Sequence, residues 1–170
     1  RGVIWDLARH GYVAAAVDYR RLVGGRFERS LFPWREPGDE QLFLEIVRGS
    51  PRVDRSRLAL LGFSQGGVFS LYAASRSPDI RAVVAYYPVT DFEHWLRDPD
   101  YGALRRLGFW FVRRHFKGAS GARTDEDYHR MLAMASPLGQ AGSITAPVLL
   151  VHGTRDRTAP VHESRRLDSR

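Results

Sequence analysis

Residues 58–69 form the segment that most restricts what this chain can fold into. They read Leu-Ala-Leu-Leu-Gly-Phe-Ser-Gln-Gly-Gly-Val-Phe, an apolar run followed by one serine among glycines and then by further apolar residues. The pattern predicts a buried strand that turns sharply into a helix, with Ser64 at the tip of the turn. So sharp a turn leaves little room for side chains two positions before and after the serine, where Gly62 and Gly66 stand. We therefore interpret Ser64 as a candidate nucleophile, with the backbone N–H of Gln65 directed at the place where a carbonyl oxygen becomes an oxyanion.

Similar apolar runs alternate with helical patterns over the rest of the chain. We expect strands at residues 12–19, 58–61, 82–87 and 147–151, and helices that end at residue 10, begin at residue 39, follow Ser64 and begin near residue 161. Residues 20–38 contain paired glycines and two prolines and are expected to form a loop. Continuous apolar strands separated by helices indicate a mostly parallel sheet covered by helices on both faces. The fold class is therefore α/β, and 170 residues suit one domain.

The charge pattern argues against a nucleic-acid partner, although the formal net charge is +7. All but one of the 26 basic residues are arginine, and most of them alternate with Asp and Glu instead of forming a basic tail. One coherent patch combines Arg105, Arg106, Arg113 and Arg114 on a shared helical face, which we interpret as solvated, with an anionic partner as the alternative. The sequence has no cysteine, which excludes disulfides and thiolate metal sites, and no apolar run long enough to predict a membrane span.

A carboxylate follows the last predicted strand, in the turn His152-Gly-Thr-Arg-Asp-Arg-Thr-Ala-Pro160. Ligands of open α/β sheets bind at the carboxyl ends of the strands, so Asp156 is placed where a catalytic acid could act. In the order of a serine hydrolase on such a sheet, the acid that orients the histidine follows the serine and precedes the histidine. We therefore expect Asp156 to be the acid partner of Ser64 and keep Asp91, after the strand at 82–87, as a reserve.

Five segments together resemble the catalytic domain of the prolyl oligopeptidase family, within the α/β-hydrolase superfamily. They are residues 11–20, the serine turn at 62–67, Tyr87-Pro-Val-Thr-Asp91, Ala135-Ser-Pro-Leu138 and the turn at 152–160. The resemblance implies an α/β-hydrolase fold, Ser64 as nucleophile, Asp156 as triad acid and the Gln65 amide in the oxyanion hole. It also implies a small peptide or ester substrate and neither a metal nor an organic cofactor.

Two elements of the family pattern lie outside the sequence. The triad histidine should follow one more strand after the helix that begins near Val161, and none of the six histidines stands there; they are His10, His94, His115, His129, His152 and His162. The loop that donates the second oxyanion N–H should precede the helix that contains Trp5. We therefore interpret residues 1–170 as a partial domain truncated at both ends, and expect it to be nearly inactive and poorly stable alone. We also expect the strands near residues 13–17 and 58–61 to be held apart by a strand that the chain lacks.

Between residues 91 and 136 we expect a helical, cap-like insertion. It is rich in aromatic residues, part of which should line an apolar substrate pocket. Thr124 and Asp127 have the spacing of a capping box, which predicts a helix through Met131 and Met134.

The residues leave alternative functions open. A carboxylesterase or a dienelactone-hydrolase-like esterase would use the same Ser64 and Asp156, although the founding type of the latter carries cysteine as nucleophile. A non-catalytic α/β-hydrolase-like binding protein belongs to a different class and would lack the histidine altogether. Peptide or ester preference, oligomeric state and compartment stay open, with the cytoplasm preferred for the compartment.

Overall fold

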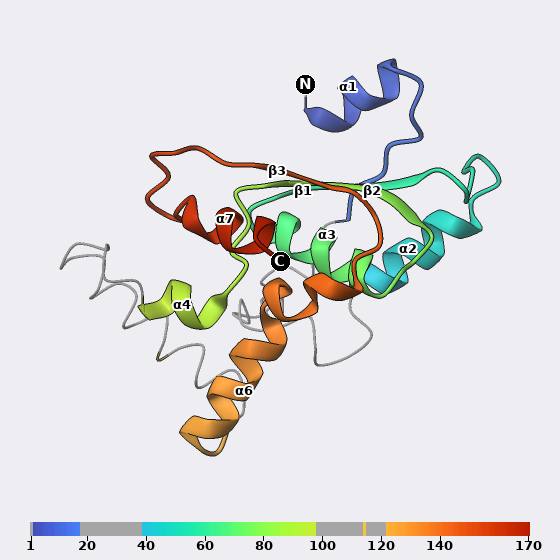
Figure 1. The fold of residues 1–170 in the computed structure, drawn as a ribbon. Coiled ribbons are helices and arrows are strands. Elements are labelled where there is room, and N and C mark those ends of the chain that lie inside the picture. Colours follow the sequence, from blue (N-terminus) through green and yellow to red (C-terminus); the bar gives the residue numbers. More distant parts are fainter. Residues whose placement is uncertain (1, 18–38, 98–113, 115–121) are drawn as a thin grey trace.

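The computed structural model describes residues 2–17, 39–97, 114 and 122–170, and the loop expected at 20–38 lies outside them. The described residues contain a parallel three-stranded sheet in the order β1 (Leu58–Phe63), β2 (Ile80–Tyr86), β3 (Val148–Val151) (Figure 1). The apolar runs predicted these three strands, within two residues at each end. A parallel α/β sheet is thus present, as the sequence predicted.

The helix α3 (Gln65–Ser75) connects β1 to β2 and lies directly under the sheet (Figure 1). Its residues 67–74 are all buried, because its sequence is apolar on every side and such a helix is stable only in an interior. Beside it lie α2 (Asp39–Gly49), the 3-10 helix η2 (Pro137–Ser143) and α7 (His162–Asp168). None of the described helices combines the length and the apolar character that crossing a bilayer requires.

The core consists of two clusters that share α3. One lies between α3 and the sheet and includes Leu44, Leu58, Leu71, Ala73, Ala74, Ile80, Val83, Ala85 and Leu167. The other joins α3 to the loop after β2, to residues 128–135 and to the turn after β3. It includes Val68, Tyr72, Val89, Phe92, Tyr128, Leu132, Ala135 and Ala159. The helix that begins at the candidate nucleophile is therefore fixed by packing on both sides.

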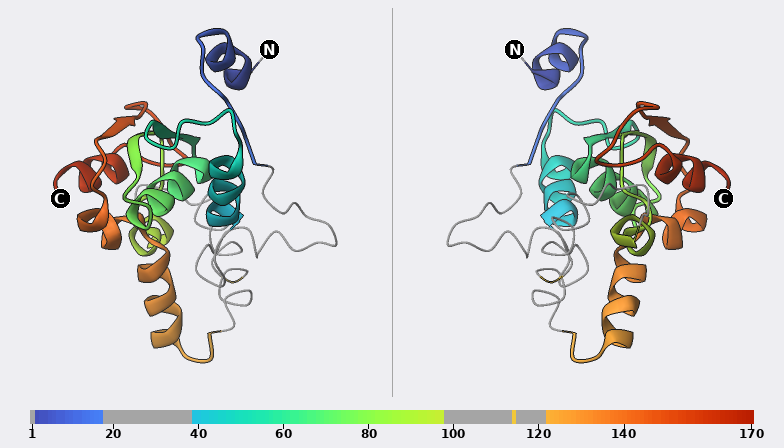
Figure 2. Two further views of the ribbon diagram at one scale, coloured as in Figure 1. Left: turned by 90° about the vertical axis from the view of Figure 1, so that its right-hand side faces the viewer. Right: turned by 90° about the vertical axis from the view of Figure 1, so that its left-hand side faces the viewer.

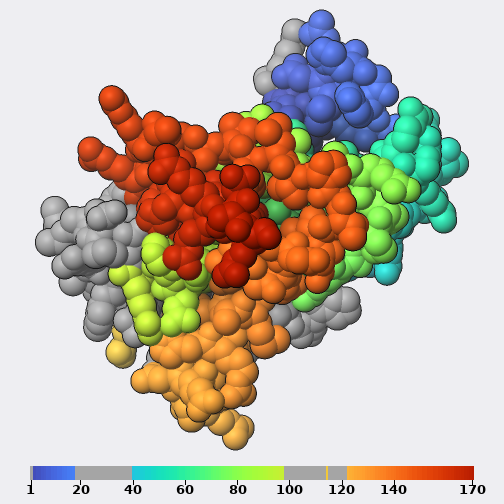
Figure 3. All heavy atoms as spheres, viewed as in Figure 1, coloured from blue at the N-terminus to red at the C-terminus, as the bar shows by residue number. Residues whose placement is uncertain are grey.

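The opposite face of the sheet carries apolar rows that the described residues leave open. The strand register places two rows across it, Leu61, Val84 and Leu149, then Phe63, Tyr86 and Val151. Leu149 is 58% exposed and Phe63 is 40% exposed. The short helix α1 (Val3–Arg9) lies on this side but has no buried residue, and the N-terminal segment stands out from the other described atoms (Figures 1 and 3). Helices thus lie on both sides of the sheet, but within the described residues only one face is well packed.

The strand expected at residues 12–19 is not formed over its described part. Residues 12–17 have no strand assignment, and Tyr12 and Val13 are 64% and 58% exposed. A strand requires a neighbour that accepts its backbone hydrogen bonds, and this segment pairs with none of the described strands. The absence of backbone pairing between this segment and β1 agrees with the expectation that the two are held apart. The prediction of a buried strand is wrong over residues 12–17.

The described part of the expected insertion contains two helices, α4 (Phe92–Arg97) and α6 (Asp125–Ala135). The capping box is confirmed, because Thr124 Oγ1 accepts from the Asp127 N–H at 3.0 Å and the Asp127 carboxylate accepts from the Thr124 N–H at 3.2 Å. The helix α6 runs away from the sheet (Figures 1 and 2). Arg114 is exposed, but the rest of the arginine patch and several aromatic residues lie outside the described residues.

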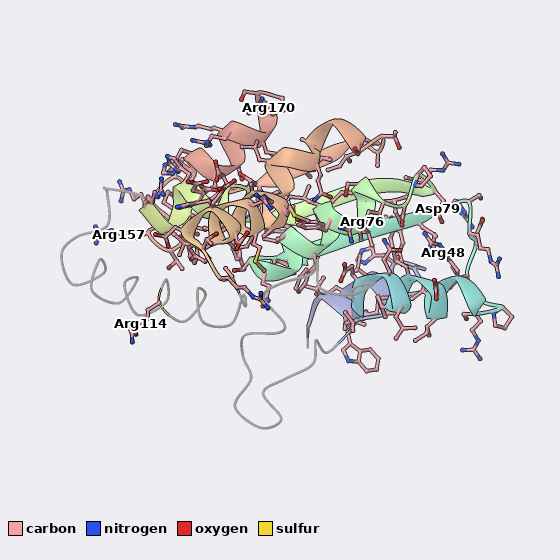
Figure 4. The ribbon with its side chains drawn as sticks, turned by 90° about the horizontal axis from the view of Figure 1, so that it is seen from below. Arg48, Arg76, Asp79, Arg114, Arg157 and Arg170 are labelled. Atoms are coloured by element: carbon pink, nitrogen blue, oxygen red, sulfur yellow. The ribbon has the colours of Figure 1, made fainter. Side chains whose placement is uncertain are left out.

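An ion pair connects α2 to the start of β2. Two nitrogens of Arg48, Nε and Nη2, donate to the two carboxylate oxygens of Asp79 at 2.8 and 2.6 Å (Figure 4). These hydrogen bonds hold the pKa of Asp79 below its ordinary value. The pair is partly exposed, with 39% of the Asp79 side chain accessible, so its contribution is modest.

We expect Asp79→Asn to lower the free energy of unfolding by about 0.5–1 kcal/mol at pH 7. Because the folded-state pKa is depressed, this stabilisation is present above the unfolded pKa of about 3.9 and is lost as pH falls through the folded value. Urea unfolding of Asp79→Asn and the parent at pH 7 and near pH 3 measures the difference in stability at each pH. Glu45→Gln, on the exposed side of α2, is the control. Equal stability of Asp79→Asn and the parent protein at pH 7 would contradict the prediction.

Candidate active site

Ser64 lies at a strained turn between β1 and α3. Its φ is 52° and its ψ is −117°, a conformation that side-chain-bearing residues rarely adopt and that costs about 1–3 kcal/mol. The Ser64 N–H donates to the Tyr86 carbonyl at 2.9 Å, and the Ser64 carbonyl accepts from Gly67 and Val68 at 2.9 and 3.2 Å. The neighbouring strand and the first turn of the helix therefore hold the strained backbone in place while the serine side chain stays exposed.

Close backbone contact requires a glycine at position 62, and position 67 is tightly packed. A Cβ atom added to Gly62 would lie 2.0 Å from the carbonyl oxygen of Gly66 and 2.5 Å from the nitrogen of Gly67. At Gly67 the added atom would lie 3.3 Å from the Pro88 Cβ. The sequence-based explanation for Gly62 thus holds, and the backbone of Gly66 is what fills the space.

Aromatic side chains surround the carboxyl ends of β1 and β2. Phe63 stacks on Tyr86 with ring centroids 4.7 Å apart, and Tyr87 lies 6.2 Å from Phe63 and 6.5 Å from Tyr86. Tyr87 has a φ of 39° and donates its N–H to the Val151 carbonyl at 2.8 Å. The strand ends beside Ser64 therefore carry a surface of contacting aromatic rings.

Asp156 lies in the turn after β3 and is partly buried. Its Oδ1 accepts from the backbone N–H groups of Thr158 and Ala159 at 2.8 and 3.0 Å. Its Oδ2 lies 4.0 Å from the His152 Nε2. One carboxylate oxygen thus shapes the turn, which fixes the direction in which the other oxygen points.

His152 ties this turn to α7. Its side chain is only 3% exposed, with Nδ1 2.7 Å from the Ser164 Oγ and Nε2 2.6 Å from the Ala159 carbonyl oxygen. The His152 ring is therefore a buried structural contact between the turn and α7.

The strand order places Ser64 and Asp156 at the same edge of the sheet. Both follow carboxyl ends of parallel strands, and β2 lies between β1 and β3. Two strand spacings amount to about 10 Å. A bridging imidazole would need a hydrogen bond to each of the two side chains.

The reserve acid Asp91 is engaged elsewhere. Its Oδ2 accepts from Arg166 Nη2 at 2.6 Å, and its Oδ1 accepts from the His94 N–H at 3.0 Å. Both oxygens thus serve to connect the loop after β2 with α4 and α7. This arrangement favours Asp156 over Asp91 as the acid.

The five described histidines have other neighbours, and His115 lies outside the described residues. His10 contacts the Asp6 carbonyl, His129 lies 3.3 Å from the Glu93 carboxylate, and His152 is buried as described. His94 and His162 both face Glu163. None of these contacts couples a histidine to Asp156 in the manner of a triad, since the nearest, His152, is turned to Ala159 and Ser164.

The sequence profile of the prolyl oligopeptidase family matches residues 5–169. The chain belongs to the prolyl oligopeptidase family. The uncharacterized peptidase YtmA of Bacillus subtilis is 26% identical to it over 99% of the chain and 62% of its own length. The human acylamino-acid-releasing enzyme is 27% identical over 91% of the chain and 21% of its own length.

The fold of this member of the prolyl oligopeptidase family is similar to that of solved hydrolase structures. The acetyl xylan esterase from Paenibacillus sp. R4 is 26% identical with a TM-score of 0.63, covering 77% of this chain and 40% of the esterase. The fold is thus that of an α/β-hydrolase. The chain spans 62% of the length of its bacterial relative and about a fifth of the human enzyme.

One group of side chains in this member of the prolyl oligopeptidase family was missed by the sequence analysis. Glu163 has a fully buried side chain that joins α7 to the loop after β2 and to α4. The spacing of Glu163 and Leu167, which both face the core from α7, hints at a buried glutamate. The partners of Glu163 come from residues about 70 positions away, so sequence spacing does not reveal them.

Proposed function

We propose that the protein is a serine hydrolase that cleaves peptide or ester bonds through an acyl-enzyme, with Ser64 as nucleophile and Asp156 as triad acid. The backbone of Ser64 carries the proposal. A strained serine between the strand β1 and the buried helix α3, with Gly62 pressed against Gly66, is the geometry that exposes a serine hydroxyl for attack. Membership of the prolyl oligopeptidase family and the resemblance to peptidases and esterases support the same reaction class.

In the proposed reaction the Ser64 Oγ attacks the substrate carbonyl carbon and transfers its proton to a histidine. The negative charge that forms on the carbonyl oxygen is stabilised by the backbone N–H of Gln65. The histidine then protonates the leaving amine or alcohol, and water attacks the acyl-enzyme by the same route. No step requires a metal or an organic cofactor.

We propose that the histidine comes from a part of the protein beyond Arg170. The described histidines have other contacts, and the bacterial relative is longer than the chain. Asp156 would hold the histidine by its Oδ2, because Oδ1 is engaged by Thr158 and Ala159. On this proposal the isolated 170-residue chain reacts slowly with a fluorophosphonate probe, whereas the full-length protein reacts quickly.

We expect Asp156→Asn in the full-length protein to lower kcat by about 10²–10⁴-fold. The neutral amide stabilises neither the required tautomer nor the imidazolium that forms during attack. Hydrolysis of an aminoacyl p-nitroanilide and of p-nitrophenyl acetate gives the measurement, and urea unfolding shows whether the turn survives.

Asp91→Asn is the matched control for this variant. Asp91 lies after the neighbouring strand and is bonded to Arg166 and His94, so its loss should change kcat by less than about threefold. A larger fall in kcat for Asp91→Asn than for Asp156→Asn would reverse the assignment of the acid.

An esterase is the second candidate, favoured by the TM-score of 0.63 to the acetyl xylan esterase. Both candidates use Ser64 and Asp156, so variants of these residues do not distinguish them. The ratio of kcat/KM for an acetylated aminoacyl amide to that for a short-chain acetate ester does. A ratio near that of an esterase, with no measurable amide cleavage, would exclude the peptidase form of the proposal.

A further inference from the structure

A buried carboxylate and two imidazoles meet where α4 and α7 pack together, apart from Ser64 and Asp156. The Nδ1 of His94 lies 3.3 Å from the Glu163 Oε1, and the Nε2 of His162 lies 3.7 Å from the same oxygen. One ligand atom from each residue lies within 4.8 Å of the other two. The two rings are perpendicular, with centroids 4.9 Å apart.

Glu163 is held so that one oxygen is committed to the backbone and the other faces the histidines. Its Oε2 accepts from the N–H groups of Thr90 and Asp91, both at 2.9 Å. The Thr90 hydroxyl donates to the Glu163 carbonyl at 2.6 Å. The glutamate side chain is 0% exposed, and these hydrogen bonds fix its position. Oε1 therefore already points at His94 and His162, and binding an ion would not have to order this side chain.

We propose that His94, His162 and Glu163 form a binding site for a divalent transition metal of the zinc class. Tetrahedral coordination with bonds of about 2.0–2.1 Å places ligand atoms about 3.3 Å apart. The contact of His94 with Glu163 at 3.3 Å matches this spacing, and that of His162 at 3.7 Å is slightly longer. Since the three ligand atoms lie within 4.8 Å of one another, the side chains must draw together to enclose an ion. Two imidazoles and one carboxylate favour zinc-like ions over magnesium or calcium, which prefer oxygen ligands.

The two imidazoles are partly exposed, which gives an ion access to the cluster from the surface. His94 and His162 are 36% and 31% exposed, whereas the Glu163 side chain and the Nε2 atom of His162 are buried. The neighbouring Asp91 is neutralised by its ion pair with Arg166, which leaves the Glu163 carboxylate as the charge that attracts the cation.

Metal binding would clamp α4 to α7. The helix α7 also carries Ser164, the partner of His152, and His152 contacts the turn that contains Asp156. An ion at this site would therefore stabilise the loop after β2 and the acid-bearing turn together. Metal binding at this site does not depend on the proposed hydrolysis, so it can be measured directly, without an activity assay.

The test is a titration of the EDTA-stripped, dialysed full-length protein with ZnCl₂ by isothermal calorimetry, repeated with Co²⁺ and visible absorption. We expect one zinc ion at this site per chain, and a loss of affinity of at least about 100-fold in His94→Ala and in His162→Ala, since loss of an outer-sphere partner alone costs 10–100-fold. Glu163→Gln should lose zinc affinity by a similar factor, because the negative charge is gone. The variant should still fold, because its amide oxygen can accept from the N–H groups of Thr90 and Asp91. His10→Ala, an exposed histidine at the end of α1, is the matched control and should bind zinc as the parent does.

Two outcomes would overturn the proposal. One is a parent protein that shows no zinc binding up to about 1 mM. The other is a His94→Ala, His162→Ala double variant that retains the parent affinity and the tetrahedral Co²⁺ spectrum. Circular dichroism of each variant confirms folding, and the histidine variants decide the outcome if Glu163→Gln does not fold.

Discussion

Replacing Ser64 with alanine is expected to lower kcat of the full-length protein by about 10⁴–10⁶-fold on both amide and ester substrates. Alanine removes the oxygen that forms the acyl-enzyme, so only binding and oxyanion stabilisation remain. Both residues carry a Cβ, so the strained φ of 52° is unchanged and the free energy of unfolding should shift by less than about 1 kcal/mol. Steady-state kinetics and labelling by a fluorophosphonate probe give the measurement.

Ser75→Ala is the control on the same helix. The Ser75 hydroxyl donates to the Tyr72 carbonyl and lies 3.1 Å from the Gln140 Oε1, away from the turn at Ser64. Its loss should leave labelling unchanged. A full-length protein that cleaves neither substrate and is never labelled at Ser64 would favour the non-catalytic binding protein over a hydrolase. A Ser64→Ala variant that keeps the parent kcat would show that Ser64 is not the nucleophile.

Gly62→Ala is expected to destabilise the full-length protein by more than about 3 kcal/mol and to abolish labelling at Ser64. The added methyl group would lie 2.0 Å from the Gly66 carbonyl oxygen, and this neighbour is backbone that cannot rotate away. To relieve the contact, β1 must move from α3 or the turn must open, and either change removes the strained geometry of Ser64. Urea unfolding and fluorophosphonate labelling report on the two consequences separately.

Gly142→Ala offers a matched comparison. Gly142 lies in η2, and a Cβ added there meets no atom within 4 Å. This variant should unfold within about 0.5 kcal/mol of the parent and be labelled at the same rate. If Gly62→Ala behaved like Gly142→Ala, the close contact between β1 and the start of α3 could not be what holds the serine.

Much of the fold follows from local patterns in the sequence. The runs that became β1, β2 and β3 are apolar, short and bounded by helical periodicity, and each was predicted within two residues. The capping box at Thr124 and Asp127 was predicted from two residues three positions apart and is formed in the structure. The strand expected at residues 12–19 failed over its described part, because apolar character alone does not supply a hydrogen-bonding neighbour.

For the candidate site, the sequence by itself determined the turn at Ser64. The constraint is local, since the glycines that permit the strained backbone lie within three residues of the serine. It also determined the family, because the profile of one family matches residues 5–169. The preference for Asp156 over Asp91 in the proposed triad comes from tertiary structure, because Arg166 and His94 occupy both oxygens of Asp91. The same holds for the cluster of His94, His162 and Glu163. His94 lies 68 residues before His162 and 69 before Glu163, and it meets them only because α4 and α7 pack together, a contact between distant segments that no local pattern encodes.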